Sequence, residues 1–212
     1  MAVPDSVSLH HLEGTYTLSV FIVASVLSSL REIYPSQLLI GTAQNKKISD
    51  DTDPILKMQG VSWFIRNAIY YSTIVLHVKE YTDDAGNVHI DIEQALTGGI
   101  KSLEERTLDW TDRDKDDRVF GKVKGRTRFV KSDDIPENFL RNGWDDKSVR
   151  NDDGLLIQSY VESRDKDPNW TADQIWGFEI VEGKRRYVRH VYAKKGKEEH
   201  RVKLVYDWTP GA

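Results

Sequence analysis

Apolar and polar residues alternate along most of the chain that follows residue 72. The segments with this pattern are STIVLHVKEY, VHIDIEQAL, SLEERTLDW, RVFGKVKGRTRFV, GLLIQSYVES, DQIWGFEIV, RRYVRHVYA and HRVKLVYDW. Turn-forming stretches such as DDAGN, TDRDKDD and KKGKEE separate several of them. A period of two is typical of strands, and evenly spaced strands without long helices between them favour an antiparallel barrel or sandwich. The sequence therefore predicts a mainly β protein.

Two short helices are expected just before these strands, in DTDPILKMQGVSWFIRNAIYYST. Asp53 suits an N-cap, Pro54 suits a first helical turn, and Gly60 favours a break between the helices. In the second segment apolar residues recur every three or four positions, which predicts one stripe that covers another part of the fold. The stripe consists of Val61, Phe64, Ile65, Ala68 and Ile69.

Alternation also predicts which way several strands face. In KVKGRTRFVK one face carries four basic residues, which we assign to the solvated side of the sheet rather than to a nucleic-acid site. In HIDIE the polar residues His89, Asp91 and Glu93 are expected outside, with Ile90 and Ile92 inside. The strand RRYVRHVY leaves its facing open, because either face places a charged or imidazole group inside the fold. The four basic residues are Lys122, Lys124, Arg126 and Arg128.

The most apolar stretch, LSVFIVASVLSSLREIYPSQLLIGTAQNKK, runs from Leu18 to Lys47. We do not expect a signal sequence, since no basic region precedes it, nor stable membrane insertion, since its uncharged run is short and rich in Ser and Thr. Two interpretations stay open for residues 19–44: an apolar helix packed over the fold, or an insertion such as a translated intron. A real helix would favour weak contact with a membrane surface or a second copy through residues 19–30.

Composition restricts the function classes. The 212 residues are 39% hydrophobic and 30% charged, which is typical of a globular protein. The formal net charge of -4 gives no electrostatic reason to bind nucleic acid, and the absence of cysteine excludes disulfides and fits a cytoplasmic location. The six histidines are scattered, and no recognisable catalytic, phosphate-binding or metal-binding motif occurs. No cofactor, metal or assigned catalytic residue is therefore expected.

The order of elements resembles that of the intracellular fatty-acid-binding proteins of the calycin group. GTYTL is similar to their first strand, DPILKMQGVSWFIRNAIYYST to their helix-turn-helix lid, and FEIVEGKRRYVRHVYAKKGKEEHRVKLVYDW to their last three strands. Segments such as MQGVSWF, HIDI, LTGGI and WGFE also resemble a group of uncharacterised fungal proteins. The resemblance implies a calycin-type antiparallel barrel of about ten strands with a helical lid.

The resemblance further implies a single domain over residues 1–212. In the family the first strand leads almost directly to the lid, so residues 19–44 are expected to be an insertion between them, and a further loop insertion with a short helix at 136–140 is expected at residues 132–153.

A cavity that holds an apolar small molecule is the main functional implication of the resemblance. In the family, arginines on the antepenultimate and last strands and a final tyrosine meet the ligand carboxylate. Tyr206 matches the tyrosine, but Phe178 and Leu204 stand at the arginine positions, which favours a neutral or hydroxylated ligand unless Arg189 or Arg201 reaches inside. The expected ligand-binding residues are Trp63, Phe64, Trp176, Phe178, Ile180, His190, Tyr192, Leu204 and Tyr206.

Two functions follow from this interpretation. The first is binding of a lipid, fatty-acid-like or terpenoid or polyketide molecule in the cavity. The alternative is a cofactor-independent isomerase or cyclase that acts on an apolar biosynthetic intermediate in the same cavity, and the sequence leaves open whether the protein is an enzyme. Confinement and one or two acid or base groups can support such chemistry, with Tyr206, Tyr192, His190 and Asp91 as candidates.

Overall fold

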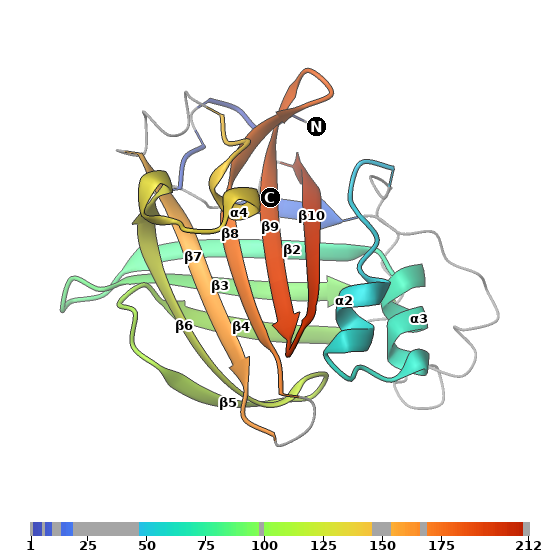
Figure 1. Ribbon diagram of the computed structural model, residues 1–212. Helices are drawn as coiled ribbons and strands as arrows, with labels where there is room; N and C mark the ends of the chain where they lie inside the picture. The colour runs from blue at the N-terminus through green and yellow to red at the C-terminus, as the bar shows by residue number, and fades with distance from the viewer. Residues whose placement is uncertain are drawn as a thin grey trace.

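The computed structural model describes residues 2–5, 7–9, 14–18, 47–97, 100–145, 154–165 and 169–209. Within these ranges ten strands form one antiparallel sheet in the order β4-β3-β2-β1-β10-β9-β8-β7-β6-β5 (Figure 1). The strands are β1 (Gly14–Leu18), β2 (Ile74–Thr82), β3 (Val88–Leu96), β4 (Ile100–Thr107), β5 (Arg113–Asp117), β6 (Gly121–Lys131), β7 (Leu155–Ser163), β8 (Thr171–Val181), β9 (Lys184–Lys195) and β10 (Glu198–Thr209). The mainly β, antiparallel fold expected from the sequence is therefore confirmed.

Strand β1 joins the two halves of this sheet. Its backbone pairs with β2 on one side and with β10 on the other, so the first and last strands of the chain are neighbours. The sheet order leaves β4 and β5 as the two edge strands. These edges approach each other, because Lys115 Nζ on β5 donates a hydrogen bond to the Leu103 carbonyl oxygen on β4 at 3.3 Å.

Helices α2 (Asp53–Met58) and α3 (Trp63–Tyr71) form the expected pair before β2, and α2 lies beside β10 (Figure 1). The N-cap of α2 is Thr52, one residue before the expected Asp53, and Ser62 Oγ caps α3 by accepting from the Ile65 amide. The apolar stripe is only partly covered: Ile65 packs against the core, whereas Phe64 is 49% exposed. In the described ranges no helix is long and apolar enough to cross a membrane.

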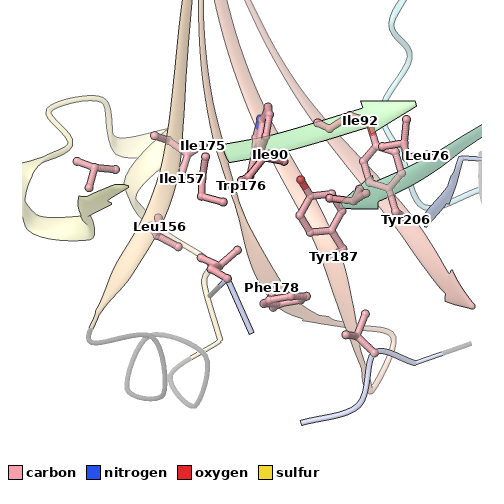
Figure 2. Close-up of a cluster of buried hydrophobic side chains, with 14 of the residues drawn as sticks. Leu76, Ile90, Ile92, Leu156, Ile157, Ile175, Trp176, Phe178, Tyr187 and Tyr206 are labelled. Carbon is pink, nitrogen blue, oxygen red and sulfur yellow. The ribbon is translucent and has the colours of Figure 1, made fainter. Parts of the chain in front are cut away.

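The inner face of the sheet carries the apolar core (Figure 2). Many of its largest buried side chains come from strands on both halves of the sheet, where a period of two brings Trp176 and Phe178 to the inner side. Leu156 and Ile175 of the same cluster are buried on the opposite face of β7 and β8. In β3, Ile90 and Ile92 are fully buried, as expected from HIDIE. The main members are Leu76, Ile90, Ile92, Ile157, Trp176, Phe178, Tyr187 and Tyr206.

Strand pairing determines which side chains of β6 and β9 point to the inner face of the sheet and which point to the outer face. The basic residues of β6 lie on the outer face, where Arg126 and Arg128 stack on Trp110 with guanidinium carbons 4.4 and 4.2 Å from the ring centroid. In β9, Arg189 is on the same face as buried Tyr187, whereas His190 is on the opposite, outer face. The structure thus selects one of the two facings that the sequence left open.

A short segment after β6 covers the outer face of β8 and β9. It contains η1 (Ser132–Asp134) and α4 (Asn138–Arg141), the latter close to the expected helix at 136–140. Trp144 lies over His190 with 4.3 Å between the ring centroids. Residues 19–44, for which the sequence left a helix and an insertion as alternatives, and residues 146–153 lie outside the described residues.

Candidate functional site

A cavity of about 260 Å³ lies on the inner side of the sheet. Its size is near the lower limit of typical small-molecule sites, which begin at roughly 300 Å³. Part of the wall is apolar and comes from β6 to β10 and from the residue just before β8: Val123, Val161, Trp170, Ala172, Val191 and Leu204. Polar groups are spaced between them: Gln59, Glu104, Arg106, Thr127 and Gln174. This mixture suits a largely apolar molecule with a small number of hydrogen-bonding groups.

An ion pair from β4 forms the polar part of the wall. Arg106 Nη2 donates to Glu104 Oε2 at 2.8 Å, and Gln94 Nε2 on β3 donates to Glu104 Oε1 at 2.5 Å. Arg106 also reaches across the interior, where its Nη1 donates to Ser159 Oγ on β7 at 2.9 Å. The guanidinium is therefore held from two sides of the sheet, and its position is fixed before any molecule binds.

A second guanidinium lies beside this pair, in the core. Arg189 Nε donates to the Tyr187 hydroxyl at 3.1 Å, and its guanidinium carbon is 4.1 Å from the Trp176 ring centroid. The ring centroids of Tyr187 and Tyr206 are 5.4 Å apart (Figure 2). Arg189 Nη2 is buried and has no hydrogen-bond partner in the part of the chain that the structure describes. Arg106 is 5.3 Å from the same Trp176 ring, so this indole lies near both cations.

Burial and charge shift the pKa values of these groups. Burial favours the neutral form of Glu104, but the guanidinium groups of Arg106 and Arg189 outweigh it and hold the pKa of this carboxyl below its ordinary value. Burial raises the pKa of Tyr206 to about 12, although Arg189 acts in the opposite direction. The pKa of Tyr187 is raised for the same reason. At neutral pH the Glu104 carboxylate therefore lies among guanidinium groups, and the buried phenols of Tyr187 and Tyr206 are neutral.

The structure separates the expected ligand-binding residues into four sets. Leu204 lines the cavity, and Trp176, Phe178 and Tyr206 belong to the buried core of the inner face. His190 and Tyr192 lie on the outer face of β9. Trp63, Phe64 and Ile180 are exposed at 68%, 49% and 57%. Of the four acid or base candidates, Tyr206 alone faces inward, since Asp91 also lies on an outer face.

Contacts on the outer face of β9 bury His190, and the cavity takes no part in its burial. Its ring stacks on Phe139, Nδ1 donates to the Phe139 carbonyl oxygen at 2.8 Å, and Nε2 is 2.5 Å from Glu179 Oε1. Lys203 Nζ is 3.1 Å from the other oxygen of Glu179. Arg201, which the sequence left as a possible inward group, pairs with Glu137 on this face at 3.1 Å.

Sequence reasoning missed the Glu104–Arg106 pair. Both residues lie in SLEERTLDW, where alternation alone would direct Leu103 inward. The structure shows the reverse facing, with Leu103 53% exposed and Glu104 and Arg106 inside. A run of three charged residues gives no apolar alternation, so the sequence carries no signal for this facing.

Comparison with known proteins gives two fungal sequence relatives. The chain is 29% identical over 171 residues to a probable pericyclase of Mollisia scopiformis, which covers 79% of this chain and 87% of the relative. It is 27% identical over 168 residues to a pericyclase of an Acremonium species, with 77% and 87% covered. No family model matches the chain.

Solved structures similar to this one include fatty-acid-binding protein 1 of Echinococcus granulosus, with a TM-score of 0.47, 12% identity, and coverage of 93% of this chain and 97% of that chain. The fluorescent protein UnaG matches with a TM-score of 0.47, 13% identity and the same coverage. The resemblance to a group of fungal proteins is found in the two sequence relatives, which are both fungal.

Proposed function

We propose that the protein is a cofactor-independent cyclase that binds an apolar biosynthetic intermediate in the cavity and accelerates a pericyclic ring closure. The observation that carries the proposal is the prearranged Glu104–Arg106 pair in the wall of a cavity that apolar side chains such as Val191 and Leu204 also line. The names of the two sequence relatives support the same class of reaction. A lipid-like, polyketide or terpenoid chain with a polar group at one position fits this wall.

Confinement is the first contribution that the cavity can make. A pericyclic closure forms its bonds in one cyclic step, so a flexible chain must first bring its reacting carbons together. Holding the chain in its reactive conformation before the reaction lowers the barrier, because the conformational entropy has then been lost on binding. The walls formed by Val191, Leu204 and Trp170 provide a rigid shape for the folded chain.

Electrostatic stabilisation is the second contribution. A guanidinium fixed by Glu104 and Ser159 can donate a hydrogen bond to a carbonyl oxygen that is conjugated with the reacting carbons. Electron density withdrawn through that oxygen lowers the barrier, and a donor that is already oriented does not need to reorganise during the reaction. Arg106 is the group on the cavity wall that we assign to this role.

Deletion of the gene in its native fungus tests the proposal. Substrate and product of a pericyclic closure are isomers, so the deletion strain should accumulate a compound with the mass of the wild-type product, a different retention time and more extended conjugation. Liquid chromatography with mass and ultraviolet detection measures all three properties. An unchanged product profile would contradict the cyclase proposal.

Binding without catalysis is the second candidate function. The cavity volume and the apolar part of its wall support binding alone as well as they support catalysis, because both functions need an apolar molecule to be enclosed. Titration of the purified protein with the same isomers separates the two: a carrier would bind them and release them unchanged. Conversion of one isomer into the other would exclude a pure carrier.

A further inference from the structure

The cavity reaches the molecular surface between the two edge strands of the sheet. Its wall continues from buried residues such as Thr127, which is 2% exposed, to exposed side chains on β4 and β5. We name this opening the seam and define it by Glu105, Thr107, Arg113, Lys115 and Asp117. The outermost of these side chains belong to the same continuous cavity wall as Val191 and Leu204 deep inside.

A side-chain hydrogen bond, rather than backbone pairing between strands, bridges the seam. In the described sheet β4 and β5 are the two ends of the strand order, and backbone hydrogen bonds do not pair them. At the level of β5, the Lys115 Nζ hydrogen bond to the Leu103 carbonyl oxygen spans the seam. Deeper inside, Arg106 Nη1 on β4 also donates to Thr127 Oγ1 on β6 at 3.4 Å. The lysine is exposed, and exposed side chains change rotamer within nanoseconds, so this contact can open without movement of the backbone.

The helical end of the cavity is closed more firmly. Helix α2 buries three of its side chains against the inner faces of β9 and β10: Ile55, Leu56 and Met58. Arg66 joins the two helices, since its Nε donates to Asp53 Oδ1 at 2.7 Å and its Nη1 donates to the Val61 carbonyl oxygen at 2.8 Å. Movement of the helices would expose these apolar groups to water, whereas movement of Lys115 exposes none of them.

We propose that small molecules enter and leave the cavity through the seam, with the Lys115 side chain as the moving part, while α2 and α3 stay in place. This inference rests on the proposed function only in taking the cavity as the site that a ligand occupies. It assigns access to the gap between the edge strands instead of to the helices.

A buried thiol reports the route without any ligand. The chain contains no cysteine, so Thr127→Cys places a single thiol of similar size in the cavity wall. The probe is Ellman's reagent, a bulky aromatic disulfide with two negative charges. The measured quantity is its second-order rate of reaction with the thiol, with tryptophan fluorescence and the thermal unfolding midpoint as checks that each variant is folded.

Three further substitutions in the Thr127→Cys background separate the routes. Lys115→Ala opens the seam, Arg66→Ala loosens the contact between the helices, and Lys79→Ala removes a lysine from the outer face of β2 as the matched control. We expect Lys115→Ala to raise the rate severalfold, with the other two within twofold of the parent. Loss of a positive charge would by itself slow an anionic reagent, so a faster reaction reports a wider opening.

Each contrary outcome overturns the seam as the route. Acceleration by Arg66→Ala without acceleration by Lys115→Ala would assign access to the helices. Equal rates in all variants, or equal acceleration by Lys79→Ala, would also exclude a role for Lys115 as the gate. The thiol measurement needs no substrate, so a failure of the cyclase proposal would leave its result unaffected, and the reverse also holds.

Discussion

Replacement of Glu104 by Gln tests the charge arrangement of the interior. The substitution keeps the size of the side chain and its ability to accept from Gln94, but it removes the negative charge. Arg106 and Arg189 are then left without the carboxylate that compensates them. An unpaired buried charge is strongly destabilising, because the charge has lost its hydration and no ion pair replaces it.

The structure gives a magnitude for this change. Removal of one partner from a fully buried pair costs about 3–5 kcal/mol. The side chains of Glu104 and Arg106 retain 24% and 18% exposure, so we expect the lower end of that range, about 3 kcal/mol. For a domain of this size such a change corresponds to a decrease in the unfolding midpoint of roughly 6–12 °C.

Acid unfolding adds a second signature. The pKa of Glu104 is lowered in the folded state, so its contribution to stability is complete above its unfolded value near 4.5 and is lost as the pH falls towards the folded value. The Gln variant cannot lose this contribution. Its free energy of unfolding should therefore decline less steeply than that of the wild type over the acidic range.

Urea unfolding followed by tryptophan fluorescence, at pH 7 and at steps below pH 5, measures both effects. Glu93→Gln is the matched control, because Glu93 pairs with Lys101 on the exposed outer face and should contribute less than about 1 kcal/mol. A Glu104→Gln variant within about 0.5 kcal/mol of the wild type, the range usual for neutral surface changes, would refute the reasoning. An unchanged acid profile would refute it as well.

Three further outcomes follow from the same structure. Gly177→Ala should destabilise the protein by about 1–3 kcal/mol in thermal unfolding, since the added carbon would lie 2.7 Å from Trp144 Cε3 and 2.8 Å from a methyl group of Leu156; an unchanged midpoint would contradict the packing described. Leu204→Trp should fill the cavity and lower conversion of the substrate by about a hundredfold while the chain stays folded, and full conversion by this variant would exclude the cavity as the site. The pKa of Tyr206 is raised to about 12 from an ordinary 10.0, so the folded protein should lose stability as the pH rises between these values. The thermal unfolding midpoint should fall less over that range in Tyr206→Phe than in the wild type, and parallel curves of midpoint against pH would contradict the burial of the phenol.

The strands and helices could be predicted because local patterns determine them. The facing of β3 follows from Ile90 and Ile92, whose outer neighbours are all polar. The position of α2 follows from Pro54 in its first turn. In these elements one face meets water and the other meets the core, so a period of two or 3.6 is visible in the sequence.

The facing of β9 could not be predicted, because this strand is buried on both sides. Arg185 to Val191 are all buried: the inner face meets the core, and the segment that contains α4 covers the outer face. Some polar side chains of this strand have hydrogen-bond partners far away in sequence. Arg185 Nη1, for example, donates to the carbonyl oxygens of Pro4 and Val7.

The residues of the cavity wall could not be predicted from the sequence either. Arg106 meets Ser159, which is 53 residues away, only after β4 and β7 have been placed on opposite sides of the interior. The resemblance to fatty-acid-binding proteins directed attention to Phe178 and Leu204, where the family has arginines. The two guanidinium groups beside Glu104 come instead from β4, which carries Arg106, and from β9, which carries Arg189.

Conversion of the isolated isomer by the purified protein tests the central claim most directly. The compound that accumulates in the deletion strain is incubated with the wild-type protein, with Leu204→Trp and with buffer alone, without any added cofactor, and the products are separated by chromatography. The wild type should produce the native cyclic isomer of the same mass, and the filled-cavity variant should not. Recovery of the compound unchanged, or equal conversion in buffer and with both proteins, would contradict a cyclase function.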